Sequence, residues 1–228
     1  MKNYLVTGIN SGLGKYLAFH LSDGKGLHRY NFNEISSNEY DVIIHCAFNK
    51  TNKIDGLLGH YQYLNDNIFL TQKLLELKHS HFIYISSIDV YNGNNNYSLF
   101  KRFVESIVIR KDNTTILRCP MMIGRTMKPN HITKMLCENN ETLTLSGEST
   151  FNYILYKDIL KFIQNKNYEE IDGLYDFIST DNVKLKDIKK EFKSTVKFGN
   201  YVYETPDNFI NPFYTNRTSI ETIKEYFK

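Results

Sequence analysis

The sequence predicts an α/β protein with a doubly wound parallel sheet and a small C-terminal lobe. Two observations predict this fold class. Apolar runs rich in β-forming residues alternate with segments of helical periodicity, which is typical of strands joined by crossover helices. A glycine-rich turn directly follows the first of these runs and opens the first helix. The second half of the chain is less regular, so we expect it to add later strands and helices to the core and to form the lobe.

The individual elements follow from periodicity and composition. Residues 4–6 form a short apolar strand, and apolar residues recur at helical spacing through residues 14–21. Residues 41–47 are almost continuously apolar, which indicates a strand buried on both faces. Further strands are predicted at 81–86, 114–118, 142–145 and 174–178, and further helices at 67–77, 97–109 and 158–164.

Length and composition favour one domain. The 228 residues are 41% hydrophobic and 23% charged, which is enough to bury one substantial core. We expect a single domain over residues 1–228, with the sheet core in about 1–125 and the lobe mainly in 126–228. The net charge is +3, and lysines and arginines are scattered along the chain, so nucleic-acid binding is not expected. The expected partner is a small molecule.

The cysteines and the apolar runs indicate an intracellular protein. Cys46, Cys119 and Cys137 are odd in number and lack C-x-x-C spacing, which favours reduced thiols over a disulfide framework. No segment resembles a signal peptide, and no apolar run approaches the roughly 18 residues that span a bilayer. We therefore expect a cytoplasmic protein without membrane contact.

The glycine-rich turn extends from Thr7 to Gly14. Gly8 would permit a tight turn out of the strand, Gly12 would let backbone amides approach a pyrophosphate, and Gly14 would let the helix pack close to the sheet. Such a turn is typical of dinucleotide-binding, Rossmann-type folds. Three glycines alone also fit a plain strand–turn–helix connection. The position of the turn, between a strand and an amphipathic helix, favours the binding interpretation.

The choice of dinucleotide depends on the stretch after the first helix. NAD-binding folds usually place a carboxylate about 20 residues beyond the glycines, where it holds the ribose hydroxyls. Residues 27–33 contain no carboxylate, and the first one is Glu34. Arg29, Asn31 and Ser11 would tolerate a 2′-phosphate, which favours NADP over NAD. Arg29 is equally consistent with a solvated surface charge.

A tyrosine–lysine pair lies far downstream, on the helix predicted at 97–109. Tyr97 and Lys101 are four residues apart, which places both on one helix face and lets the lysine charge lower the phenol pKa from its ordinary value near ~10. Such a phenol is a usable proton shuttle. A solvent-facing pair has the same spacing. However, Ser87 ends a strand ten residues earlier and can place a hydroxyl beside the phenol, so the three residues together favour catalysis.

These motifs resemble the extended short-chain dehydrogenase/reductase family, the NAD-dependent epimerase/dehydratase group that acts mainly on nucleotide-linked sugars. The resemblance is an order of motifs over most of residues 1–190. Beyond the glycine turn it runs through 42–47 (VIIHCA), 67–71 (NIFLT), 82–91 (FIYISSIDVY), 117–125 (LRCPMMIGR) and 145–159 (LSGESTFNYILYKDI). The family pattern in 82–91 assigns the catalytic hydroxyl to Ser87 rather than Ser86.

The resemblance implies a mechanism and a set of site residues. Tyr97 would exchange a proton with a sugar hydroxyl or ketone, Ser87 would orient that oxygen, and Lys101 would hold the nicotinamide ribose and lower the tyrosine pKa. Hydride would pass between the sugar carbon and the nicotinamide. The expected cofactor contacts are Gly8, Asn10, Ser11, Gly12, Leu13, Gly14, Arg29, Asn31, Cys46, Ala47, Phe48, Lys101 and Pro120, and the expected substrate contacts are Ser87, Tyr97 and Arg125.

Several positions depart from the family pattern. The glycine spacing is that of the shorter, single-domain branch, and the chain between the first helix and Asp41 is too short for the usual strand, helix and strand on the adenine side. Ile88 replaces the first of two acids that sugar dehydratases carry after the catalytic hydroxyl, which argues against dehydration. Phe151 stands where the family often has an arginine on the nucleotide diphosphate, although Arg125 or Arg217 could supply that charge.

Other polar and aromatic residues have simpler interpretations. His45 lies inside an apolar strand and is expected to be a core histidine; no second ligand accompanies it at metal-binding spacing, so no metal is predicted. Asp158 is expected to be a helix N-cap. The aromatic residues of 198–214 are expected to pack the lobe, with a platform for a sugar or base as the less favoured alternative.

The sequence thus predicts an NAD(P)-dependent oxidoreductase or epimerase acting on a sugar, namely a nucleotide-linked keto- or hydroxy-sugar. Most simply, it is a keto-sugar reductase or a 4-epimerase in polysaccharide biosynthesis. The alternative is a catalytically silent NADP-binding regulator or scaffold, whose abbreviated lobe no longer closes over a sugar. The resembling family often dimerises through a four-helix contact, which leaves a homodimer open.

Overall fold

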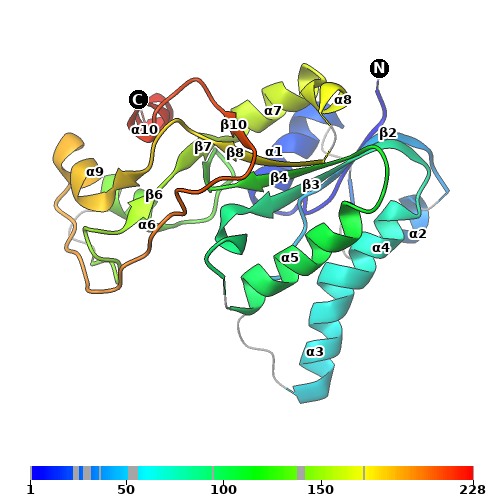
Figure 1. The fold of residues 1–228 in the computed structure, drawn as a ribbon, viewed down its shortest axis with the longest axis horizontal. Coiled ribbons are helices and arrows are strands. Elements are labelled where there is room, and N and C mark those ends of the chain that lie inside the picture. Colours follow the sequence, from blue (N-terminus) through cyan, green and yellow to red (C-terminus); the bar gives the residue numbers. More distant parts are fainter. Residues whose placement is uncertain are drawn as a thin grey trace.

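A six-stranded, all-parallel sheet forms the centre of the molecule (Figure 1). The computed structural model describes residues 2–22, 26–27, 32–35, 37–50, 56–93, 95–137, 142–171 and 173–227. The strand order is β1-β2-β3-β4-β8-β10, and every neighbouring pair is parallel. The strands are β1 (Tyr4–Val6), β2 (Tyr40–His45), β3 (His79–Ser87), β4 (Thr114–Cys119), β8 (Gly173–Ile178) and β10 (Pro212–Tyr214). The predicted Rossmann-type α/β class is confirmed.

Helices cover both faces of this sheet (Figure 1). One face carries α1 (Gly12–Leu21) and α7 (Tyr156–Gln164), followed by the short α8 (Asn167–Glu170). The other face carries α5 (Asn96–Val108) and a long helix made of α3 (Gly56–Leu64), the π-helical turn η1 (Asn65–Phe69) and α4 (Leu70–Leu75). The first part of that long helix, α3, was not predicted from the sequence.

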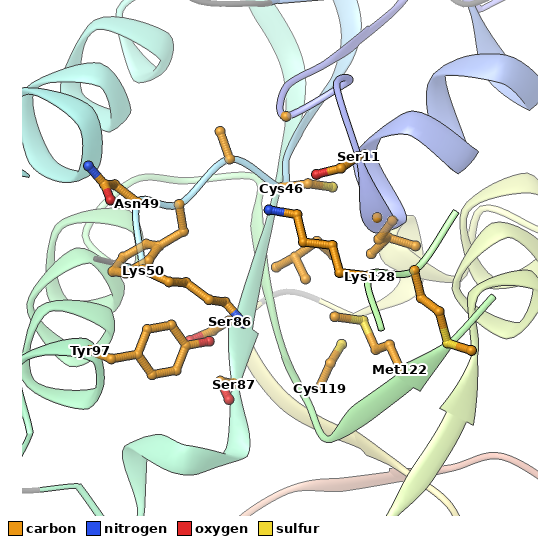
Figure 2. Close-up of a pocket in the computed structure, with 18 of the residues that line it drawn as sticks. Ser11, Cys46, Asn49, Lys50, Ser86, Ser87, Tyr97, Cys119, Met122 and Lys128 are labelled. Atoms are coloured by element: carbon orange, nitrogen blue, oxygen red, sulfur yellow. The ribbon is translucent and has the colours of Figure 1, made fainter. Parts of the chain in front are cut away.

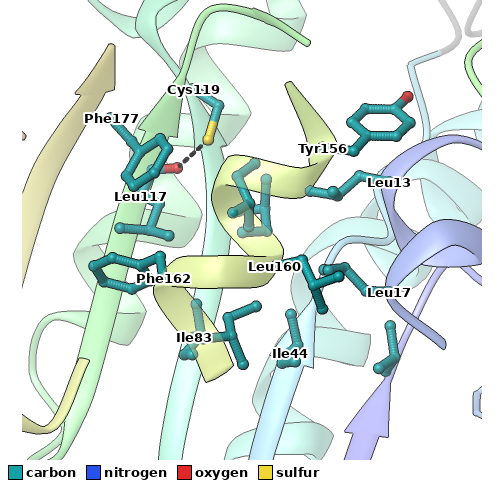
Figure 3. Packing of buried hydrophobic residues seen from close by; sticks show 14 of the residues in the cluster. Leu13, Leu17, Ile44, Ile83, Leu117, Cys119, Tyr156, Leu160, Phe162 and Phe177 are labelled. Carbon is teal, nitrogen blue, oxygen red and sulfur yellow. Dashed lines mark hydrogen bonds between the residues drawn. The ribbon is translucent and has the colours of Figure 1, made fainter. Parts of the chain in front are cut away.

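Two apolar cores lie between the sheet and these helix layers. Side chains alternate along a strand, so Ile43 of β2 faces α4 and α5 while Ile44 faces α1 and α7. Figure 3 shows the second of these cores, where Leu17 of α1 and Leu160 of α7 pack over Ile44 and the neighbouring strands. Burial on both faces explains the apolar run in β2 at 42–44 and the one in β3 at 82–85.

The lobe has a core of its own, beside the carboxyl ends of the sheet strands. It contains the parallel pair β5 (Met121–Ile123) and β7 (Tyr153–Leu155), the antiparallel pair β6 (Thr150–Phe151) and β9 (Val183–Lys184), and the helices α6 (His131–Cys137), α9 (Leu185–Glu191) and α10 (Ser219–Phe227). Ile132, Leu185 and Ile223 are fully buried in this core. The chain returns from the lobe to the main sheet twice, at β8 and at β10.

The described residues between α1 and β2 contribute one bridge and one short helix to the adenine side of the sheet. Among the described residues between α1 and β2, Leu27 pairs with Thr7 through one isolated parallel bridge, and α2 (Phe32–Ile35) is a single turn.

Two local predictions were wrong. Residues 142–145 do not form a strand, because Thr142 and Leu145 pair with residues 197 and 201 only through isolated bridges. Asp158 is the third residue of α7 rather than its N-cap. Its carboxylate accepts the N–H of the N-cap residue Leu155 at 3.0 Å, which still satisfies a free amide at the helix start. None of the described helices is long and apolar enough to cross a bilayer.

Candidate active site

A cavity of about 980 Å³ opens at the carboxyl ends of the first four strands, between the sheet and the lobe. Four segments line it from the sheet side: residues 7–14 after β1, 46–50 after β2, 85–89 at the end of β3 and 119–122 after β4. Ligands of parallel α/β sheets bind at this edge, because loops and helix N-termini from several strands converge there. The lobe adds Phe151, Asn152, Tyr203 and Thr205 to the opposite wall.

The glycine-rich turn presents backbone to this cavity. Gly8 and Gly12 have φ angles of 75° and 62°, a left-handed region that residues with side chains rarely adopt. A Cβ at Gly14 would lie 2.5 Å from the Gly8 carbonyl oxygen, so only glycine lets the first turn of α1 approach the strand end this closely. A close-fitting backbone at a helix N-terminus is what a pyrophosphate group requires, so these residues fit a dinucleotide.

The loop after β5 holds the glycine-rich turn from the lobe side. The Gly12 N–H donates to the Thr126 carbonyl at 2.8 Å, and the Thr126 hydroxyl donates to the Gly12 carbonyl at 2.6 Å. Because Gly12 is the first residue of α1, one amide that the sequence assigned to a pyrophosphate is bonded to the protein itself. The neighbouring Leu13 and Gly14 also line the cavity.

Buried hydrogen bonds fix the ends of β1 and β2 relative to each other. Thr7 Oγ1 accepts from the amides of the two residues after His45 at 3.1 and 3.0 Å, and it lies 2.8 Å from His45 Nδ1. His45 Nε2 lies 3.0 Å from Thr71 Oγ1, whose proton goes to the Asn67 carbonyl at 2.8 Å. His45 must therefore donate from Nε2 and accept at Nδ1. Burial lowers the pKa of His45 to about 3, and its prediction as a core histidine is confirmed.

The π-helical turn η1 positions the segment that follows β2. Asn67 in this turn accepts the Asn49 N–H through Oδ1 at 2.7 Å and donates to the Asn49 carbonyl through Nδ2 at 3.2 Å. The side-chain amide thus pairs with the backbone as a neighbouring strand would. Single π-helical turns frequently occur at functional sites, and this one holds Phe48 and Lys50 along the cavity wall.

Ser87 and Tyr97 line the cavity, and Lys101 lies behind them. Ser87 ends β3, and Tyr97 lies in the first turn of α5. Asn95 caps α5 by accepting a backbone N–H of that first turn at 3.0 Å, which starts the helix just before Tyr97. Lys101 lies one turn further along, only 3% exposed, and donates from Nζ to the Ile85 carbonyl at 2.8 Å.

The electrostatics of this trio differ from the prediction. Burial raises the pKa of Tyr97, and the hydrogen bond with Ser87 opposes that rise. Lys101 Nζ lies between two aromatic rings, 4.3 and 4.6 Å from their centroids, and burial together with the Lys50 charge lowers its pKa to about 7. We expected Lys101 to lower the pKa of Tyr97. A lysine that is charged only part of the time near neutral pH does not offset the burial of the phenol.

Solved structures share this architecture over their full length. The chain is similar to dTDP-4-dehydrorhamnose reductase from Bacillus anthracis in complex with NADP, with a TM-score of 0.75, 17% identity, and coverage of 100% of this chain and 99% of that chain. It is also similar to RMD from Pseudomonas aeruginosa complexed with NADPH (TM-score 0.73, 17% identity, coverage 98% and 99%). A third is a point mutant of UDP-glucuronic acid 4-epimerase from Bacillus cereus, in complex with a fluorinated UDP-sugar and NAD (TM-score 0.67, 17% identity, coverage 98% and 92%).

The chain has the fold of the extended short-chain dehydrogenases/reductases. The resemblance predicted from the sequence is confirmed in the fold. No protein-family model matches the sequence, and no curated protein matches it. At this low identity, the structure carries a likeness that the sequence shows only as an order of short motifs.

Within this extended short-chain dehydrogenase/reductase fold, most of the predicted site residues meet in the cavity. Lys101 lies behind the lining, with Nζ against the Phe48 ring. Arg125 is exposed and is not one of the lining residues, whereas Arg29 and Asn31 lie outside the described residues. The predicted residues that line the cavity are Gly8, Asn10, Ser11, Gly12, Leu13, Gly14, Cys46, Ala47, Phe48, Ser87, Tyr97 and Pro120.

Two lysines in the cavity were missed by the sequence analysis. Lys50 and Lys128 reach into it from opposite walls, as Figure 2 shows. Lys50 Nζ lies 5.0 Å from the centroid of the Tyr97 ring. Lys50 follows the carboxyl end of a parallel strand. Residues at that edge of a parallel sheet commonly meet ligands, so its position in the sequence could have indicated it as a site residue. No comparable signal marked Lys128, because its loop is placed by tertiary contacts with Gly12.

The lobe side of the cavity carries an aromatic stack. Tyr203 stacks on Phe151 with centroids 4.8 Å apart, and His131 packs against Phe151 at 4.1 Å. The Tyr203 hydroxyl donates to the Asp89 carboxylate, which joins the lobe to the loop after Ser87. Tyr203 therefore packs the lobe, as expected, and it also lines the cavity. Phe213 of the same stretch packs in the core of the main sheet instead, because it lies on β10.

The two arginines considered for a substrate diphosphate lie elsewhere. Arg125 is exposed, and Arg217 pairs with Asp158 and Glu225 and lines a different, smaller pocket. The cations that line the cavity among the described residues are Lys50 and Lys128. These lysines, rather than the arginines, are placed to meet an anionic group of a ligand.

Proposed function

We propose that the protein is an NAD(P)-dependent oxidoreductase or epimerase that acts on a nucleotide-linked sugar, with Tyr97 as the proton shuttle. One observation carries this proposal. Ser87 and Tyr97 line the same cavity as the glycine-rich turn, and Lys101 is buried one helical turn from Tyr97. A site for a dinucleotide and a site for proton transfer thus share one space.

The chain's own residues divide the work. Tyr97 exchanges a proton between its phenol oxygen and the sugar oxygen, and Ser87 holds that sugar oxygen through its hydroxyl. Lys101, buried one helical turn from Tyr97, supplies positive charge when its amine is protonated. The bound nicotinamide supplies the hydride chemistry. The closed backbone turn of Gly8 and Gly14 binds and orients the dinucleotide.

The two residues after Ser87 favour a reductase or an epimerase over a dehydratase. Ile88 follows Ser87 and is buried, and it offers no proton to expel water. Asp89 accepts the hydroxyl of Tyr203 and is therefore held in a structural contact. NADP stays the favoured dinucleotide in this proposal, on the sequence of residues 29–31.

The test is the substitution Tyr97→Phe, which removes one oxygen and keeps the ring. Turnover should fall by a factor of about 10² to 10⁴, because proton transfer loses its positioned group. The dissociation constants of NADPH and NADH, measured by fluorescence titration, should stay within about twofold. Tyr61→Phe, on the exposed face of α3, is the matched control and should leave both unchanged.

The assay needs a panel of UDP- and dTDP-linked keto- and hydroxy-sugars with both dinucleotides. Turnover that survives in Tyr97→Phe would refute the assigned shuttle. Tight dinucleotide binding without oxidation, reduction or epimerisation of any sugar would instead support the catalytically silent NADP-binding regulator. Absence of dinucleotide binding in the unmodified protein would reject both.

A further inference from the structure

The last three residues of β3 each contact α5 through a different residue of one helix face. The Ile85 carbonyl accepts from Lys101 Nζ at 2.8 Å, and the Ser86 hydroxyl donates to Glu105 Oε1 at 2.5 Å. Ser87 lies beside Tyr97 on the cavity wall. Residues 97, 101 and 105 are spaced by four, so they form one stripe along α5. The catalytic tyrosine and lysine therefore belong to a row of three contacts, and the third contact is made by Glu105.

Glu105 is a buried carboxylate with all of its partners charged or polar. Arg118 of β4 donates from Nε to Oε1 at 3.0 Å and from Nη2 to Oε2 at 2.7 Å. Glu105 and Arg118 are only 5% and 8% exposed. Ser86 and Arg118 are register partners on adjacent strands, so one carboxylate joins the ends of both strands to α5. Buried ion pairs contribute little net stability, which leaves another role for this one.

The charges around Lys101 give Glu105 that role. Among the described residues, four groups face Lys101. Lys50 and Cys46 follow β2, Cys119 ends β4, and Glu105 lies on the same helix as Lys101. Burial and the charge of Lys101 both lower the pKa of His45, so its ring is neutral. Burial and Lys50 lower the pKa of Lys101, whereas Glu105 raises it. Of these groups, Glu105 is the carboxylate.

We propose that Glu105 is a positioning residue for the catalytic pair: it joins α5 to the ends of β3 and β4 and supplies the negative charge that favours the ammonium form of Lys101. This inference rests on the roles given to Tyr97 and Lys101 in the proposed function. Arg118 limits the effect, because its guanidinium balances the same carboxylate at short range. Burial and Lys50 lower the pKa of Lys101 more than Glu105 raises it, so Glu105 opposes these two influences in part.

The test measures the titration midpoint of Lys101 in variants that remove the charge of Glu105, of Arg118, or of both. The titration of the Lys101 side chain is followed by its ¹³Cε NMR resonance in protein labelled with ¹³C-lysine, assigned with Lys101→Arg. Glu105→Gln keeps an acceptor for Ser86 but removes the charge and leaves Arg118 uncompensated. Its Lys101 midpoint should fall by about one unit from the value of about 7 in the unmodified protein. Arg118→Gln removes the neighbouring cation and should raise the midpoint.

If a single variant does not fold, the double variant Glu105→Gln/Arg118→Gln still allows the Lys101 midpoints to be compared. It leaves no unpaired buried charge, and its Lys101 midpoint should lie below that of Arg118→Gln. A purely structural ion pair would destabilise both single variants and leave the Lys101 midpoint where it was, which would overturn the proposal. Shifts of the same sign in the two single variants would overturn it as well.

The titration needs neither substrate nor dinucleotide, so it is independent of the proposed reaction. Active enzyme gives a second readout: the alkaline limb of the kcat profile against pH should move down in Glu105→Gln and up in Arg118→Gln. If the Lys101 midpoint falls in Glu105→Gln and rises in Arg118→Gln, but the unmodified protein turns over no sugar, the role of Glu105 is upheld and the proposed function is rejected. If turnover is lost in Tyr97→Phe, but the Lys101 midpoint is unchanged in Glu105→Gln and Arg118→Gln, the proposed function is upheld and the role of Glu105 is rejected.

Discussion

His45 illustrates how one polar side chain is accommodated inside a parallel sheet. Both ring nitrogens have hydroxyl partners, Thr7 at 2.8 Å and Thr71 at 3.0 Å, so a neutral ring is buried without an unsatisfied atom. His131 in the lobe has a hydroxyl partner on one ring nitrogen, with Nε2 2.7 Å from the Tyr153 hydroxyl. Protonation of either ring would place a charge where no carboxylate partners it in these contacts.

Stability should therefore fall as the pH drops below about 6.5. Burial lowers the pKa of His45 to about 3 and that of His131 to about 4, whereas histidine titrates near ~6.5 in an unfolded chain. Between these values the unfolded state binds more protons than the folded state. The free energy of unfolding should then decrease by about 2 kcal/mol for each histidine between about pH 6.5 and about pH 5.

Urea unfolding at a series of pH values measures this slope. His131→Phe should remove about half of it, because one of the two buried rings no longer titrates. That variant also leaves the Tyr153 hydroxyl unpaired and lowers stability at every pH, so the slope rather than the midpoint is the readout. A slope equal to that of the unmodified protein would contradict the assignment.

At the scale of elements, the start of α1 depends on how closely it approaches the end of β1. The α1 N-terminus carries no side-chain cap, and its first residues lie against backbone carbonyls. A Cβ at Gly14 would lie 2.5 Å from the Gly8 oxygen and 2.6 Å from the Thr7 oxygen. Both obstacles are backbone atoms, so neither can turn aside as a flexible side chain would.

Gly14→Ala should therefore move the helix start and open the glycine-rich turn. We expect stability to fall by about 1–3 kcal/mol, as for other overpacked sites, and the dissociation constant of NADPH to rise at least about tenfold. Ala18→Gly, one turn further along the same helix, is the control. It should cost about 1 kcal/mol through helix propensity while leaving NADPH binding intact. Equal losses of binding in both variants would show that the close approach at Gly14 is unimportant.

At the scale of the whole molecule, the segment before β10 ties the lobe to the sheet across the cavity. The Tyr203 hydroxyl donates to Asp89, Asn92 Nδ2 donates to the Glu204 carbonyl, and the amide of residue 210 donates to Asp176 at 2.9 Å. These contacts all reach the sheet or the loop after Ser87. The lobe and the proton-transfer residues are therefore held at a fixed separation.

Tyr203→Phe tests this tie and keeps the stack on Phe151. The substrate KM should rise severalfold, since Asp89 and the lobe wall lose their connection, and unfolding free energy should fall by about 1 kcal/mol. The dissociation constant of the dinucleotide should not change, because Tyr203 lies on the opposite wall from the glycine-rich turn. Tyr201→Phe is the matched control, as Tyr201 is 64% exposed. An unchanged KM in Tyr203→Phe would show that the contact between Tyr203 and Asp89 does not affect substrate binding.

The sequence by itself determined the sheet class, the glycine-rich turn and the order of Ser87, Tyr97 and Lys101. These follow from local rules: apolar periodicity marks the buried strands, positive φ angles require glycine, and a spacing of four places two side chains on one helix face. The short strands of the lobe lacked such signals, because β6 and β9 have two residues each and form only where distant segments meet.

The tertiary structure alone decided the chemical state of the site. The spacing of Tyr97 and Lys101 placed them together, yet burial raised the tyrosine pKa and lowered that of the lysine, and no local pattern encodes burial. Lys50, Lys128 and the Glu105–Arg118 pair reach the site from other segments, and their effect depends on distances through the folded core. Electrostatic interactions act through space rather than along the chain, so only the folded molecule fixes them.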